Sequence, residues 1–286
     1  MKLIIMPKSI SMLNNLLDKI DGVIVGYKGL CMNMPKDYSK EEIEDIIKIC
    51  KDNNKEVFIS LNKNMFNKDI DSLKEVMISL DNMGVNGILY YDIALVNIKE
   101  ELGLKVDLVW NQEHLTTNYL TMNFWYEYGA KYTLISNEIT LDEIKDIKKN
   151  AKCKLMFYAF GYITMFVSRR NLVKNYLETF NIDDNSKINY LSKEGKEYQI
   201  IDTEDGTIAY SDRVLNAIKE SIEIDADYTI LNSFSIDEDI FNKIVDLFSK
   251  VSTDNALEYK EEIDKMLPTY LGFLYNETIY KVKKND

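Results

Sequence analysis

The chain has few of the residues that cross-link small proteins or bind metals. It contains one histidine and three cysteines, Cys31, Cys50 and Cys153. The cysteines are odd in number and lack CxxC spacing, which argues against a disulfide framework and favours a reducing compartment. We therefore expect no metal site and no iron–sulfur cluster built from this chain alone.

Proline and glycine are also scarce, with 3 and 11 residues, and no low-complexity tract separates two halves of the sequence. A chain of 286 residues at 46% apolar composition can bury a large core. One large domain is the first expectation and two closely packed domains the second. No run of about 18 apolar residues occurs, and the N-terminal KLIIM is too short for a signal sequence. We expect no membrane association and a cytoplasmic location.

Arginine is rare and acidic residues are in excess. The net charge is −12, from 35 Lys and Arg against 47 Asp and Glu. Such a surface repels nucleic-acid backbones, so tRNA would bind only if a partner supplied basic surface. The arginines are Arg169, Arg170 and Arg213. The adjacent pair suits a carboxylate or phosphate, because a guanidinium offers a planar fork that lysine lacks. An ordinary surface ion pair is the alternative.

Eight short apolar runs alternate with amphipathic stretches that have helical spacing. The predicted strands are 2–6, 22–27, 56–61, 87–91, 105–110, 131–135, 154–160 and 227–232. Their number and spacing predict a (β/α)8 TIM-type barrel. A doubly wound open sheet is the alternative, although no Gly-rich phosphate-binding turn follows any strand.

Capping boxes of the S/T-x-x-E type predict where helices begin, and two glycines predict where helices end. The boxes are Ser39 with Glu42, Thr140 with Glu143 and Ser235 with Glu238, and the glycines are Gly84 and Gly129. The barrel is expected to span 1–253. It would include a β-rich excursion at 181–213 that turns at Asp205-Gly206. Residues 254–286 are expected to form a helix and a strand-like tail packed on the barrel.

Barrel enzymes place their sites on residues that directly follow the strands. Glu138 and His114 are the candidate catalytic residues, since a carboxylate near an imidazole can exchange protons. The candidate ligand-binding residues are Asn62, Gln112, Ser168, Arg169 and Arg170. The alternatives are a structural role for His114 and a favourable helix-dipole interaction for Glu138. Cys31 and Ser168 are candidate nucleophiles by residue type, but neither lies in a nucleophile-elbow motif.

The helical stretch 171–180 has an apolar stripe at Leu172, Val173, Tyr176 and Leu177. This stripe is expected to pack toward the barrel and so turn Arg169 into the cavity. Its N-terminal amides would favour an anion there. Arg170 would then form an ion pair with a carboxylate.

Six segments carry a known family pattern in matching order and spacing: EVFISLN (56–62), NMGVNGILYYD (82–92), NQEHLTTN (111–118), YGAKYTLISNEITLDEI (128–144), KLMFYAFGYITMFVSRRNLVKNYLE (154–178) and GFLYNETIYKVKKND (272–286). Through them the chain resembles the collagenase-like peptidase family, U32, especially its short Firmicutes-type members. The family's central signature is filled by Tyr158 or Phe160, Gly161, Met165, Ser168, Arg169 and Arg170. Asn171 stands where many relatives have cysteine.

The resemblance implies a barrel and a nominal peptidase whose mechanism is unassigned. It also implies two alternatives: a subunit of prephenate-dependent tRNA uridine hydroxylation acting with a paralogous partner chain, or a non-catalytic scaffold barrel. An anionic small molecule or a peptide would be the ligand. The iron–sulfur cluster of longer relatives is not expected, since Asn171 replaces a cysteine.

Overall fold

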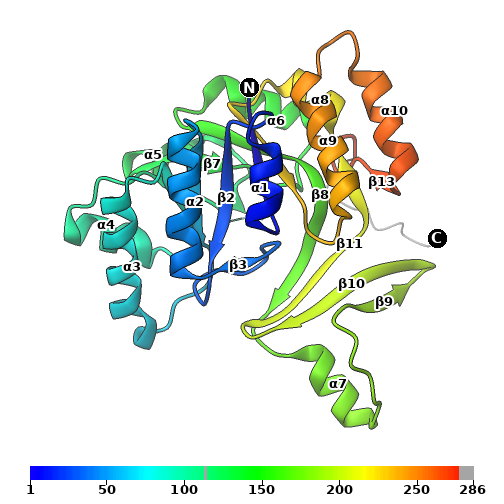
Figure 1. The fold of residues 1–286 in the computed structure, drawn as a ribbon, viewed down its shortest axis with the longest axis horizontal. Helices are drawn as coiled ribbons and strands as arrows, with labels where there is room; N and C mark the ends of the chain where they lie inside the picture. Colours follow the sequence, from blue (N-terminus) through cyan, green and yellow to red (C-terminus); the bar gives the residue numbers. More distant parts are fainter. Residues whose placement is uncertain (113–114, 277–286) are drawn as a thin grey trace, which may run out of the picture.

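A closed barrel of eight parallel strands forms the centre of the molecule in the computed structural model, which describes residues 1–112 and 115–276 (Figure 1). The last barrel strand pairs in parallel with both the first and the seventh, which closes the ring. In chain order the strands are β1 (Lys2–Met6), β2 (Gly22–Tyr27), β4 (Glu56–Leu61), β5 (Gly87–Tyr90), β6 (Leu108–Trp110), β7 (Ala130–Leu134), β8 (Lys154–Ser168) and β12 (Tyr228–Asn232). The predicted barrel is confirmed, and each predicted strand overlaps an observed one.

Helices cover the outside of the ring (Figure 1). They are α1 (Ile10–Leu16), α2 (Lys40–Asp52), α3 (Ile70–Met83), α4 (Ala94–Leu102), α5 (Tyr119–Glu127), α6 (Leu141–Asn150), α8 (Ile218–Ile224) and α9 (Glu238–Lys250). Two short elements accompany them, the 3-10 turn η1 (Asn67–Asp69) and the strand β3 (Asp37–Tyr38), which pairs with β2.

Two of the three predicted capping boxes are confirmed. Ser39 and Thr140 begin α2 and α6, each with a reciprocal bond from the glutamate three residues later. The third is wrong, because Asp237 caps α9 by accepting from two backbone amides of the first turn. Ser235 instead lies in a left-handed turn with φ of 55°. Asp237 is nearer the helix and already accepts from the first-turn amides, so these amides do not need Ser235 as a cap.

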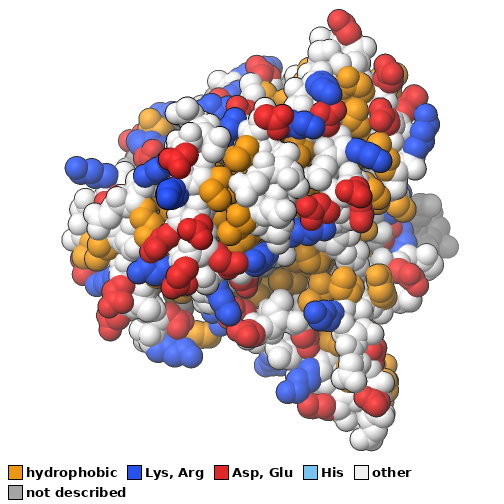
Figure 2. All heavy atoms as spheres, viewed as in Figure 1, with side chains coloured by type: hydrophobic (Ala, Val, Ile, Leu, Met, Phe, Trp, Pro, Cys, Tyr) orange, Lys and Arg blue, Asp and Glu red, His pale blue; other side chains and the backbone are white. Residues whose placement is uncertain are grey.

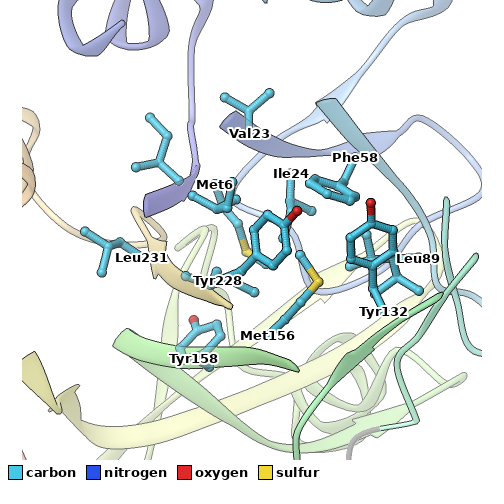
Figure 3. Close-up of a cluster of buried hydrophobic side chains, with 14 of the residues drawn as sticks. Met6, Val23, Ile24, Phe58, Leu89, Tyr132, Met156, Tyr158, Tyr228 and Leu231 are labelled. Carbon is cyan, nitrogen blue, oxygen red and sulfur yellow. The ribbon is translucent and has the colours of Figure 1, made fainter. Parts of the chain in front are cut away.

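Apolar and aromatic side chains fill the barrel interior (Figure 3). The rings of Phe58, Tyr132 and Tyr228 meet edge to face, with centroids 5.2 to 5.7 Å apart. Lys2 and Glu56 form an ion pair of 2.5 Å at the starts of their strands. This packing fills the barrel toward the N-terminal ends of the strands and leaves the opposite end as the place for a site.

Asp227, which directly precedes β12, makes the stability of the fold depend on pH. Partial burial would raise its pKa, but hydrogen bonds from Lys148 and from the backbone amide of Leu155 outweigh this and hold the pKa below its usual value. A carboxyl whose pKa is lower in the folded than in the unfolded state stabilises the fold at any pH above its unfolded-state pKa. This stabilisation is lost as the pH falls through the folded-state pKa. We expect Asp227→Asn to lower the free energy of unfolding at pH 7 by about 1 kcal/mol, given the solvent screening of the pair.

The difference between Asp227→Asn and wild type should begin to shrink below about pH 4, where the unfolded chain takes up the proton, and should vanish at lower pH, where the folded carboxyl is neutral as well. Urea denaturation at pH 7 and pH 3 measures both differences. A deficit of equal size at the two pH values would contradict the electrostatic origin of the effect.

Strand β8 continues beyond the ring and carries an arm (Figure 1). Past Gly161 it leaves its parallel neighbours and pairs antiparallel with β11 (Gly206–Asn216). The arm also contains α7 (Leu172–Phe180), β9 (Asn189–Lys193) and β10 (Lys196–Thr203). The hairpin turn is formed by Glu204 and Asp205, one residue earlier than the predicted Asp205-Gly206, because Thr203 pairs with Gly206. The excursion therefore begins inside β8 rather than at residue 181, because β11 gives the outgoing strand a partner.

Helix α7 lies at the far end of the arm and contacts β10 and β11, with no residue fully buried. The prediction that its apolar stripe packs toward the barrel is wrong. Tyr176 and Phe180 are 56% and 61% exposed, and their rings contact each other with centroids 4.8 Å apart. The stripe covers the arm's own sheet in part and otherwise faces solvent.

The C-terminal segment returns to the barrel through α10 (Ala256–Met266) and β13 (Thr269–Tyr270), which pairs with β11. Beyond it, the carbonyl of Leu274 accepts from the amide of Leu141 at the start of α6. The hydroxyl of Tyr275 donates to the buried Glu220 carboxylate at 2.9 Å. Within residues 1–112 and 115–276, no helix has the length and apolar run needed to cross a bilayer.

Candidate functional site

A cavity of about 120 Å³ lies at the carboxyl end of the barrel, the end where the sequence predicts a site. Residues at or just beyond the ends of seven of the eight barrel strands reach it, together with the loop after β2. The polar residues lining it include Asn33, Asn62, Asn111, Ser136, Asn137, Glu138, Thr164 and Asn232. Amide side chains thus surround one carboxylate.

Backbone contacts fix the direction of two of these amides. The side-chain oxygen of Asn62, directly after β4, accepts from the amide of Met32 at 2.9 Å. The side-chain oxygen of Asn232, the last residue of β12, accepts from the amide of Phe234 at 2.8 Å. Each oxygen holds a loop, which leaves the amide nitrogen as the group available for other contacts.

Asn111 differs from these two. It follows β6, is 5% exposed, and its side-chain oxygen has no hydrogen-bond partner among the described residues. A buried polar atom without a partner costs free energy.

Glu138 is held by the turn between β7 and α6. Its backbone amide donates to the Ser136 hydroxyl at 3.2 Å, and Thr140 two residues later caps the helix. The residue therefore lies in a short, fixed connection with its side chain on the cavity. Its position after β7 is the one the sequence predicts.

Two further segments complete the cavity wall. Tyr162 to Met165 come from the part of β8 beyond the ring, and Tyr270 to Leu274 come from the C-terminal segment. Residues 162–165 directly follow the predicted strand 154–160, where the sequence predicts a site, whereas the C-terminal segment is predicted only to pack on the barrel. The signal available for the C-terminal segment was its apolar composition, LGFL, which a core strand would share.

Other predicted site residues lie away from this cavity. The side chain of Gln112 donates to the carbonyl of Tyr91 at 2.7 Å and does not line the cavity. Ser168 ends β8 in the arm, where its hydroxyl accepts from the amide of Arg170. His114 lies outside the described residues. The structure thus brings Asn62 and Glu138 together and separates Gln112 and Ser168 from them.

The arginine pair is exposed and precedes α7. The Arg169 guanidinium lies over the Phe66 ring, 4.8 Å from its centroid, and donates to the carbonyl of Asn64 at 3.3 Å. Neither Arg169 nor Arg170 lines the cavity. The first-turn amides of α7 donate to the carboxylate of Asp202, which fills the position expected for an anion. Arg169 instead ties the arm to the loop after β4.

The cysteines lie on separate elements. Cys31 donates to Asp37 and Cys153 to Thr133, each at 3.2 Å, while Cys50 is buried in α2. Burial, and for Cys31 the Asp37 carboxylate, raises the pKa of these two hydrogen-bonded thiols, which disfavours the reactive thiolate. In the part of the chain that the structure describes, no three His, Cys, Asp or Glu side chains converge as a metal site requires. These cysteines do not fit an iron–sulfur cluster.

Comparison with known proteins identifies the family pattern. A model described as peptidase family U32 matches residues 9–279. The tRNA hydroxylation protein P2 of Bacillus subtilis is 26% identical over 289 residues, which cover 90% of this chain and 91% of that protein. The tRNA hydroxylation protein P1 of the same organism is 21% identical, over 55% of this chain and 37% of P1.

Two further similar proteins are a relative that is named a protease and a U32 peptidase whose structure is solved. An uncharacterized protease of Methanocaldococcus jannaschii is 29% identical over 163 residues, covering 55% of this chain and 39% of that protein. The solved structure of a U32 peptidase has a TM-score of 0.55 at 15% identity, covering 80% of this chain and 91% of that one. At this identity the structural likeness concerns the fold alone.

Proposed function

The chain belongs to peptidase family U32, and on that premise we propose that it is a subunit of a tRNA hydroxylation system that binds a small molecule in the mouth of its barrel. The observation that carries the proposal is the similarity to the tRNA hydroxylation protein P2, which runs along nearly the whole of both chains. The cavity supports it, because convergent amides and a carboxylate at strand ends are typical of small-molecule sites in barrels.

The proposed role of the polar residues follows from their chemistry. Glu138 would exchange a proton with the bound molecule, since a carboxylate in a partly apolar cavity is a general acid or base. Asn62 and Asn111 would orient the molecule through hydrogen bonds. His114 remains the second proposed proton-transfer residue on the ground of the sequence alone. No cofactor of this chain is proposed.

We propose a second family member as the partner chain. Two proteins of one organism, P1 and P2, both carry the tRNA hydroxylation name and both resemble this chain. Acidic and basic side chains are mixed over the face shown in Figure 2. With a net charge of −12, the partner would have to supply basic surface for tRNA. The complex would act in the cytoplasm.

The arm is the proposed contact surface for this partner. Residues 162–213 carry seven basic and nine acidic residues, so the arm is nearly neutral in a strongly acidic chain. Exposed apolar side chains there include Phe166, Tyr176, Phe180, Ile182, Tyr190 and Leu191. Exposed aromatic groups on a near-neutral surface favour a protein partner over a polyanion.

Peptidase activity is the second candidate function, and the family description is the observation that favours it. Ser168 and Cys31, the nucleophiles suggested by residue type, do not line the cavity that holds Glu138. A peptidase would therefore need a water molecule as the nucleophile, activated by Glu138.

Mass spectrometry of tRNA nucleosides from a deletion strain tests the proposal. We expect 5-hydroxyuridine to disappear and to return when the wild-type chain is expressed. Glu138→Gln should restore less than one tenth of the wild-type level, because the amide cannot exchange a proton. The matched control Glu44→Gln, exposed on α2 away from both the cavity and the arm, should restore it fully. Unchanged 5-hydroxyuridine in the deletion strain, together with gelatin hydrolysis that Glu138→Gln abolishes, would establish the peptidase instead.

A further inference from the structure

The loop after β4 lies between the cavity and the arm. Asn62, the first residue of this loop, lines the cavity, and Lys63 follows it with only 9% of its surface exposed. The next part of the loop contacts the arm. The carbonyl of Asn64 accepts from Arg169, and the Phe66 ring lies under the same guanidinium. One short loop thus contacts the cavity at its start and the arm farther along.

Lys63 joins this loop to two other segments of the chain. Its ammonium donates to the carbonyl of Gly29, in the loop after β2, at 2.7 Å and pairs with the carboxylate of Asp205 in the arm's hairpin. The side chains of Lys63 and Asp205 are 11% and 19% exposed. An ammonium so far removed from water needs a counterion, because an unpaired buried charge is strongly destabilising. The position of Lys63 therefore depends on the position of the arm.

The loop after β2 carries part of the cavity wall. Asn33 and Met34 of this loop line the cavity. The amide of Met32, directly before them, donates to the side-chain oxygen of Asn62 at 2.9 Å. Since Lys63 holds the same loop at Gly29, two neighbouring residues of the β4 loop fix the β2 loop at two points, three residues apart.

Apolar side chains join the loop after β2 to the arm as well. Met32 packs with Ile208 and Tyr210 of β11 in a small cluster that is separate from the main core. The Tyr210 ring stacks on Phe234, just beyond β12, with centroids 4.2 Å apart. The side chain of Met32 therefore packs in the arm's cluster while its amide is bonded to Asn62. Polar and apolar contacts together make the arm a support for this wall of the cavity.

We propose that Lys63 is a positioning residue for the cavity: it fixes the wall formed by Asn33 and Asn62 by tying the loops after β2 and β4 to the arm. Lys63 does not itself line the cavity, so it acts through these two residues rather than on a ligand. The inference rests on the proposed function and deepens it, because it concerns the same cavity. Since the arm is the proposed contact surface for the partner, partner binding would reach the cavity through Lys63.

The double substitution Lys63→Met, Asp205→Asn tests the proposal. It removes both charges at once and leaves neither unpaired, so the melting temperature should stay within about 4 °C of wild type. Hydrogen exchange of the full-length chain should show the Met32 amide exchanging at least tenfold faster, because its loop loses the bond at Gly29. The amides of β1 and β12 should exchange as in wild type. In the complemented deletion strain, 5-hydroxyuridine should fall below one third of the wild-type level.

Two further variants calibrate the exchange measurement. Lys74→Met, Glu101→Gln is the control, because it removes an ion pair between α3 and α4 on the outside of the ring. It should leave both the exchange at Met32 and the 5-hydroxyuridine level unchanged. Asn62→Ala removes the acceptor of the Met32 amide itself and so gives the largest acceleration to be expected at that amide.

Three results would overturn the proposal. The first is unchanged exchange at Met32 in the Lys63→Met, Asp205→Asn variant. The second is an equal acceleration in β1 and β12, which would show that Lys63 supports the whole fold. The third is fast exchange at Met32 together with a wild-type level of 5-hydroxyuridine. Exchange does not involve tRNA, so if the deletion strain keeps its 5-hydroxyuridine, the proposed function fails while the exchange result still decides whether Lys63 positions this wall.

Discussion

Replacing Gly161 with alanine should lower the free energy of unfolding by about 3 kcal/mol, from backbone strain and crowding together. Gly161 has φ of +132°, a conformation that side chains rarely allow. An added Cβ would lie 2.8 Å from the Tyr158 hydroxyl and 2.9 Å from the Cβ of Asn232. It would also lie 3.0 Å from the Asn232 carbonyl, so both backbone and side chain would have to move.

Tyr158 and Asn232, the neighbours of Gly161, both line the cavity, so the proposed tRNA hydroxylation should fall together with stability in Gly161→Ala. Urea denaturation and mass spectrometry of tRNA nucleosides from the complemented deletion strain measure the two effects. The matched control is Gly103→Ala at the end of α4, where φ is +61° and no heavy atom lies within 4 Å of an added Cβ. Its cost should be about 1 kcal/mol, from the left-handed conformation alone. Equal losses in the two variants would contradict the crowding at Gly161.

The double substitution Tyr176→Ser, Phe180→Ser should weaken association with the proposed second family member at least thirtyfold. Exposed aromatic side chains contribute much of the binding energy where they meet a partner. The melting temperature should stay within 2 °C of wild type, about the change that 0.5 kcal/mol produces, because α7 has no fully buried residue.

Pull-down of the tagged chain, with quantification of the second family member, measures this association. The control is Lys174→Ser, Glu178→Ser, which removes an exposed pair from the same helix and should have little effect. Normal recovery of the partner with the aromatic variant would show that the arm is not the contact surface. A large fall in melting temperature would show that the two rings support the fold.

The ring of strands was predictable from sequence because each barrel strand is a buried apolar run, and five of the helices around the ring begin at a capping side chain. Ser39 and Thr140 show the same logic at helix starts. The prediction of the third capping box was wrong because Ser235 and Asp237, two possible caps, lie two residues apart. The sequence does not show which of them has the backbone conformation that a cap needs.

The site was only partly predictable. Asn62 and Glu138 directly follow short strands, so their place at the barrel mouth follows from the topology. Arg169 also follows a strand, but β8 runs on past the ring. Eight residues separate Arg169 from Gly161, and a strand rises about 3.3 Å per residue, so the arginine lies roughly 26 Å farther along. Apolar composition looks the same in a buried strand and in one that continues into an arm.

The point where the arm joins the barrel has a consequence for how such chains can diverge. The outgoing and returning strands are paired there, with Phe160 opposite Asn216. An insertion whose two ends are neighbours can lengthen, shorten or be replaced without displacing the barrel, because its two attachment points stay in the same place. The arm and the ring can thus change independently, so the proposed partner contact can differ between relatives while the barrel and most of the cavity wall stay the same.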